Sequence, residues 1–306
     1  MINDDVKKSL SILINNGDFE EIKFIRENMH YIRFFSQLLN EELYKVYDEN
    51  TKYNKYYSLY NSISISEDYF NSINKKYNYM FNELLNNGRI QMVKRTSNKN
   101  GSYAIGKLIN GQYYNNVMIE YNNTIEDMFS IVHEFFHTTN CINNNFKLDR
   151  LLLTESVSIF YEFLLSDYLK DNNFEEYDLP IKKRINNIIN DSNNLNNYLD
   201  NIYVGLNNLS IIESINYNEN EIYKMYNYLL SSFKYTLSSF IAIVMYYDYK
   251  RNRITLNNIE SYNNSLSFEN NLISLRHILL CIPDKEYILD SLNYFKDRYV
   301  KVYKKL

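Results

Sequence analysis

The chain has 306 residues, a formal net charge of -4 at pH 7 and an isoelectric point near 5.7, so it lacks the basic excess of a nucleic-acid-binding protein. Its length suffices to bury a hydrophobic core without disulfides, and the two cysteines, Cys141 and Cys281, are expected to be buried free thiols in a reducing compartment. The abundance of Asn and Tyr and the absence of Trp are typical of an AT-rich coding sequence and carry no functional message.

The amino-terminal stretch MINDDVKKSLSILINNGDF starts with acidic residues and holds only a short apolar run, so we expect no signal peptide. A membrane-spanning helix needs about 18 uninterrupted apolar residues. The apolar segment FIAIVMYY is far too short for that, and we expect a cytoplasmic protein without membrane or nucleic-acid partners. Because 2 prolines and 6 glycines interrupt few helices, the fold is predicted to be mainly α, with residues 1–85 as a helical amino-terminal lobe.

The next segment departs from the helical pattern. Three of the 6 glycines, Gly101, Gly106 and Gly111, fall within it, and Asn110-Gly111 is a dipeptide that a two-residue hairpin turn prefers. The stretches 89–95, 102–109 and 116–121 are therefore predicted to form one small antiparallel sheet within residues 86–122. Residues 123–306 are predicted to be helical again, and 86–306 to form a catalytic region in one compact unit with the amino-terminal lobe.

The helix that follows the sheet carries the strongest functional signal. Thr124 and Asp127 resemble a capping box at its start. A stripe of apolar residues at helical spacing then predicts that one side of the helix faces a core, namely Ile125, Met128, Phe129, Val132 and Phe136.

His133 and His137 lie one turn apart on this helix, with Glu134 directly after the first histidine. Two imidazoles at this spacing can reach one zinc ion, and the glutamate is placed to take a proton from the attacking water of a peptide hydrolysis. The competing interpretation is a helix whose two histidines have a structural role and bind no metal.

A catalytic zinc needs a third protein ligand. The downstream segment FKLDRLLLTESVSIFYEFLLSDYLK is predicted to be helical, and Glu155, Ser158 and Glu162 share one face of it. Glu155 lies 18 residues after His137, which leaves room for a turn and an antiparallel helix, so it is the favoured ligand. Glu162 is interpreted as a partner of a ligand histidine or a salt-bridge residue, and Asp149 as a weaker ligand candidate.

Two other classes of zinc peptidase are excluded because their signature residues are missing. A metzincin would carry Gly and His where Asn140 and Asn143 stand, and the aminopeptidase signature Gly-x-Met-Glu-Asn is absent. The segments NGSYAIG, VMIEYNNTIEDMFSIVHEFFHTTN and TESVSIFYE, in this order and spacing, resemble the catalytic core of the oligoendopeptidase F and thimet oligopeptidase family of zinc metallopeptidases. The resemblance covers roughly residues 86–165 and continues more faintly to the carboxyl end.

This resemblance implies an all-α catalytic domain with one small sheet, and one zinc ion per chain held by His133, His137 and Glu155. It implies that Glu134 is the catalytic base and that Tyr235, in the segment SSFKYTLSSFIAIV, stabilises the transition state. Gly101 and Tyr103 correspond to the family's substrate-binding Gly-Ala-Tyr segment, and Ser158 and Glu162 to residues that support the ligands.

Two departures from the family concern the active site. The family has a histidine shortly before the tyrosine segment, whereas this chain offers Tyr226, Asn227 or Tyr228. Only about 120 residues precede the motif, so the cleft is expected to be open, or to be completed by another subunit of a homo-oligomer.

The sequence thus predicts a zinc-dependent endopeptidase that acts on oligopeptides or on a dedicated peptide. A second hypothesis is a catalytically impaired, zinc-containing relative that binds a peptide or a partner protein. A third is a helical scaffold without metal.

Overall fold

The computed structural model describes residues 29–44, 52–96, 101–109, 112–141, 148–207, 219–265 and 285–299. Twelve elements are described, in the order α3 (Met29–Tyr44), α4 (Leu59–Ile73), α5 (Lys75–Asn86), β1 (Ile90–Lys94), β2 (Tyr103–Ile109), β3 (Gln112–Tyr121), α6 (Glu126–Cys141), α7 (Leu148–Asp171), α8 (Leu179–Asn207), α10 (Glu219–Lys250), α11 (Leu256–Ser265) and α13 (Lys285–Tyr299). The predicted mainly α fold with one small sheet is confirmed. Several predicted features lie outside the described residues, namely the Asn110-Gly111 turn, Cys281, and the side chains of Cys141, Asp149, Tyr226, Asn227 and Tyr228.

The sheet is mixed, and the prediction that it is entirely antiparallel is wrong. Its strand order is β1-β3-β2, with β2 antiparallel to β3 and β1 parallel to β3. Ile109 pairs with Gln112, which leaves only Asn110 and Gly111 between the two strands. Because β2 reverses the chain, β3 runs in the direction of β1, and pairing β1 to the free edge of β3 makes that pair parallel.

Helix α7 forms the centre of the helical part. Every residue from 155 to 167 is buried, because α6 packs on one side of α7 and α10 on another. The rings of Phe136 on α6 and Tyr161 on α7 stack at 3.5 Å between centroids, which fixes the two helices face to face. Polar side chains on α7 are therefore enclosed by protein and must find partners inside it.

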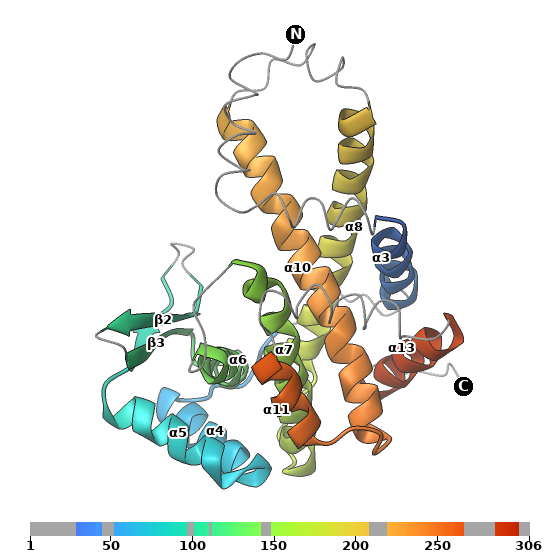
Figure 1. Cartoon of the computed structure of the whole chain (residues 1–306). Helices are drawn as coiled ribbons and strands as arrows, with labels where there is room; N and C mark the ends of the chain where they lie inside the picture. Colours follow the sequence, from blue (N-terminus) through green and yellow to red (C-terminus); the bar gives the residue numbers. More distant parts are fainter. Residues whose placement is uncertain are drawn as a thin grey trace.

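The remaining helices flank this centre on two sides (Figure 1). Helices α4 and α5 and the sheet lie on the side of α6, whereas α3 and α13 lie beyond α10. Helix α3 packs against α8, α10 and α13, and α4 packs against α6. The division at residue 85 between an amino-terminal lobe and a catalytic region stays a prediction. Among the described helices, none has the length and apolar character that crossing a membrane would require.

Candidate metal centre and active site

A buried turn positions the start of α6. The Asp127 carboxylate accepts hydrogen bonds from the backbone N–H groups of Asn122 (3.0 Å) and Asn123 (2.8 Å). Asn123 adopts φ 61°, a left-handed conformation that Asn tolerates better than most residues. The Thr124 hydroxyl donates to the Asn122 side chain instead of capping the helix, so only one half of the predicted capping box forms. Burial raises the pKa of Asp127, although these backbone hydrogen bonds oppose the rise.

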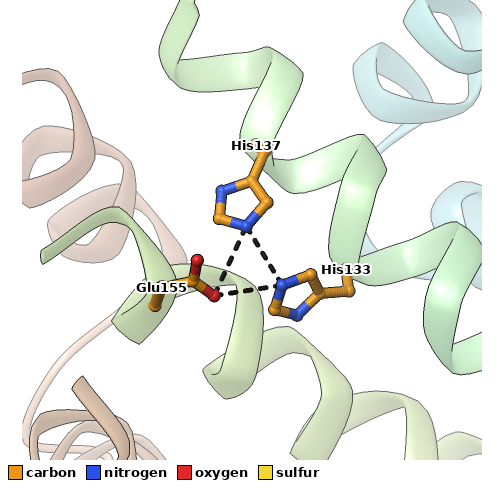
Figure 2. A group of neighbouring side chains, drawn as sticks. All are labelled: His133, His137 and Glu155. Carbon is orange, nitrogen blue, oxygen red and sulfur yellow. Dashed lines mark hydrogen bonds and ion pairs between the residues drawn. The ribbon is translucent and has the colours of Figure 1, made fainter. Parts of the chain in front are cut away.

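Three donor atoms converge between α6 and α7 (Figure 2). His133 Nε2 lies 3.0 Å from His137 Nε2 and 3.1 Å from Glu155 Oε2, and His137 Nε2 lies 3.5 Å from the same oxygen. The carboxylate is buried, and each imidazole is only partly exposed. The helical spacing brings both imidazoles to one face of α6, and the antiparallel return of the chain brings Glu155 opposite them.

These donors fit a zinc ion. Zinc bonds of about 2.0–2.1 Å to nitrogen and oxygen in a tetrahedron separate neighbouring donor atoms by about 3.3 Å. The three measured separations, 3.0, 3.1 and 3.5 Å, bracket that value. Glu155 Oε2 is also buried, and the two imidazole nitrogens are the groups that face it, so its negative charge is directed at the point where a cation would contact all three donors. The residues present therefore fit a metal with nitrogen and oxygen ligands.

The distal nitrogens of both imidazoles are held by α7. His133 Nδ1 lies 2.5 Å from Glu162 Oε1, and His137 Nδ1 lies 3.4 Å from the Ser158 hydroxyl. Such contacts orient a ligand imidazole and raise its basicity. Arg184 on α8 binds both oxygens of Glu162, at 3.1 and 2.5 Å. The imidazole of His133 is thus supported through two further charged groups.

Lys234 on α10 binds the second oxygen of Glu155, with 2.6 Å between Nζ and Oε1. This ion pair occupies Oε1 and leaves Oε2 directed to the histidines. Lys234 also lies over the ring of its neighbour Tyr235, at 5.0 Å. The ammonium therefore fixes the orientation of the carboxylate from a helix far away in sequence.

The charges of this cluster shift the pKa values of its members. Burial lowers the pKa of His133, but hydrogen bonds to Glu155 and Glu162 outweigh burial and raise the pKa to about 10. Burial raises the pKa of Glu155, but the charge of His137 and the hydrogen bond from His133 hold it well below its usual range. Without a metal, His133 and Glu155 thus form an ionised pair that neutralises its own charges inside the protein.

A cleft of about 540 Å³ opens beside the donors. His133, the buried Glu134 and Tyr235 line it, together with Gly101 and residues from α8. The negative charge of Glu155 and burial both raise the pKa of Tyr235, so its phenol keeps its proton at neutral pH and can donate a hydrogen bond into the cleft.

Tyr103 is not among the described residues that line this cleft; it lies on β2, and 44% of its surface is exposed. The roles predicted for Gly101, Tyr103, Glu134 and Tyr235 stay predictions. The sequence interpretation missed Lys234, Arg184 and Asp191. Lys234, the one charged residue in the stretch SSFKYTLSSFIAIV, was a signal for the first of these.

Comparison with known proteins agrees with this architecture. No protein-family model matches the chain, and no curated protein sequence matches it. Its fold is shared with two solved peptidase-like structures, of which the chain spans 55% of the length.

The first structure is a "putative peptidase" from Chlamydophila abortus, with 12% sequence identity and a TM-score of 0.56 over 91% of this chain. The second is a "putative oligoendopeptidase F" from Bacillus anthracis, with 16% identity and a TM-score of 0.57 over 91% of this chain. The resemblance to oligoendopeptidase F noted in the sequence is confirmed at the level of the fold.

Proposed function

We propose that the protein is a zinc-dependent peptidase that cuts within peptide chains. The observation that carries this proposal is the group of three donor atoms of His133, His137 and Glu155, which converge with tetrahedral spacing beside a cleft that His133 and Glu134 line. The fold shared with the two peptidase structures supports the same reaction class.

The residues around the donors have separate tasks in this proposal. When bound by His133, His137 and Glu155, zinc supplies a Lewis acid that polarises a carbonyl and acidifies water. Glu134 then accepts the proton of the attacking water and passes it to the leaving amine. The phenol of Tyr235 donates a hydrogen bond to the oxyanion that develops on the scissile carbonyl. Glu162 and Ser158 hold the imidazoles, and Lys234 holds Glu155.

The test is cleavage of a mixed library of internally quenched peptides by the wild type and by Glu134→Gln. We expect cleavage by the wild type, loss of about a thousandfold or more in kcat/KM in the variant, and one zinc per chain in both proteins. Glu83→Gln removes an exposed carboxylate on α5 and serves as the matched control, with wild-type cleavage expected. Cleavage by Glu134→Gln at the wild-type rate would overturn the assignment of the base.

One observation favours a second candidate function. Helix α10 contains no histidine before Tyr235, whereas the family that the chain resembles has one there, so the proposed oxyanion site lacks one donor of that family. A zinc-containing relative that binds a peptide or a partner protein without cutting it would show one zinc per chain and peptide binding, with no product. The same library, followed by fluorescence anisotropy as well as by cleavage, separates the two functions.

A further inference from the structure

The charged residues that line the cleft are mostly acidic. Among the described lining residues other than the proposed ligand His133, six are acidic and three are basic, namely Glu120, Glu126, Asp127, Glu134, Glu162 and Asp191 against Arg95, Lys183 and Arg184. A cleft walled mainly by carboxylates attracts cations and repels anions. Which carboxylate contacts a ligand depends on which ones the protein leaves without a partner.

Four of the six carboxylates are engaged within the protein. Glu126 pairs with Lys183 at 2.5 Å and accepts a hydrogen bond from Tyr53, and Glu120 lies 3.9 Å from Arg95. Asp127 caps the turn before α6, and Glu162 binds His133 and Arg184. Glu134 is assigned to proton transfer in the proposed reaction. Asp191 is the one carboxylate of the six that has neither a partner among the described residues nor a proposed role.

The Asp191 carboxylate is half-buried in the wall of the cleft, and no hydrogen bond or ion pair joins it to a residue that the structure describes. Burial raises its pKa to about 6, against an opposing effect of Arg184. The group is therefore mostly ionised at pH 7.5, and its charge is not neutralised by a contact within the described chain. A charged group kept in this condition is destabilising and is best explained by a cation that arrives with the ligand.

Asp191 lies on the same helix face as Arg184, which is linked to the candidate metal centre. Arg184, Ile188 and Asp191 follow one another at helical spacing along the face of α8 that lines the cleft. Arg184 is linked through Glu162 to His133. Asp191 lies seven residues, about 10 Å, beyond Arg184 along the axis of α8. An extended peptide covers that length with about three residues.

We propose that Asp191 is a specificity residue that binds a positively charged group of the peptide substrate, about three residues from the bond that is cut. The charged group is an ammonium or guanidinium, carried either by a Lys or Arg side chain or by the free amino terminus of a short peptide. This inference rests on the proposed peptidase function, because that function supplies the ligand.

The test uses one cleavable quenched peptide in which Lys, Gln or Glu is placed in turn at each of the four positions on either side of the cut bond. Each peptide is made with a free and with an acetylated amino terminus, and kcat/KM is measured at pH 7.5. The enzymes are the wild type, Asp191→Asn, Asp191→Lys and Asp171→Asn, which removes an exposed carboxylate at the end of α7, away from the cleft lining. Thermal melts establish that each variant is folded.

The wild type is expected to prefer Lys over Gln about tenfold at one position about three residues from the cut bond, or to prefer the free amino terminus by a similar factor. Asp191→Asn should bring that ratio close to one, and Asp191→Lys should make Glu the preferred residue. Asp171→Asn should keep the wild-type ratio. The inference is overturned if Asp191→Asn keeps the ratio, or lowers kcat/KM equally for Lys and Gln peptides.

Binding of the same peptides, measured by anisotropy in Glu134→Gln with and without Asp191→Asn, separates this inference from the peptidase proposal. Cleavage by the wild type without charge preference means that the peptidase stands and the specificity residue fails. If Lys peptides bind more tightly, this preference is lost with Asp191→Asn and no peptide is cleaved, the role of Asp191 stands and the peptidase proposal fails. If neither cleavage nor charge-dependent binding is observed, both proposals are overturned.

Discussion

At the scale of single residues, Asp191 links recognition to stability. Its pKa is raised from 3.8 to about 6 in the folded chain, which means that folding disfavours the ionised form. The resulting penalty is absent below pH 3.8, grows as the pH rises towards 6, and is complete above that value. The group is partly exposed, so solvent screening reduces the penalty to about 1 kcal/mol.

We therefore predict that Asp191→Asn increases the free energy of unfolding by about 1 kcal/mol at pH 7.5 and leaves it nearly unchanged at pH 4. Urea denaturation at pH 4, 5, 6 and 7.5 measures the difference. Asp171→Asn, on the exposed end of α7, should show no such rise between pH 4 and 6. A gain from Asp191→Asn that is equal at all four pH values would show that the ionised carboxylate is not what destabilises the wild type.

The residues of the site differ in how readily the sequence identified them. His133, Glu134 and His137 were predicted from local spacing, because a single helix fixes where they lie relative to one another. Glu155 followed from the length of chain needed for an antiparallel return. Lys234, Arg184 and Asp191 lie on α10 and α8, and only long-range packing brings those helices to the cleft. Local spacing carries no information about such packing.

At the scale of elements, the turn that leads into α6 depends on Asp127. This buried carboxylate accepts backbone hydrogen bonds at the left-handed Asn123 and thereby fixes where the helix starts. The two histidines lie on the same helix, so their position relative to α7 depends on the turn. The interaction satisfies backbone groups that would otherwise be buried without partners.

We predict that Asp127→Ala lowers the free energy of unfolding by about 2 kcal/mol, because it removes all of these acceptors at once. Asp127→Asn keeps one side-chain oxygen and should lose about half as much. Urea denaturation at pH 7.5 gives both values. Equal stability of the two variants would mean that the side-chain acceptors do not hold the turn.

The sheet shows the limit of sequence patterns for elements. The first two strands were predicted to within one residue of their observed bounds, whereas β3 starts at Gln112, four residues before the predicted start. The pattern within β1 does not reveal which edge of the β2–β3 hairpin it joins. The choice of β3 makes that pair parallel and puts β3, which packs against α6, in the middle of the sheet.

At the scale of the whole molecule, the candidate metal centre joins four helices. Its donors come from α6 and α7, Lys234 comes from α10, and Arg184 comes from α8. A cation bound there contacts the two helices at the centre of the fold directly and the other two through ion pairs. Metal binding is therefore expected to stabilise the whole folded chain, in addition to preparing the cleft.

We predict that zinc at 100 times its dissociation constant adds about 2.7 kcal/mol to the free energy of unfolding and raises the Tm by about 5 °C, and that chelation reverses the shift. Calorimetry of chelator-treated protein, with and without added zinc, measures it. His137→Ala removes one donor and should abolish most of the increase, whereas His30→Ala changes an exposed histidine on α3 and should keep it. The same increase in His137→Ala, or none in the wild type, would contradict zinc binding at this centre and with it the proposed peptidase.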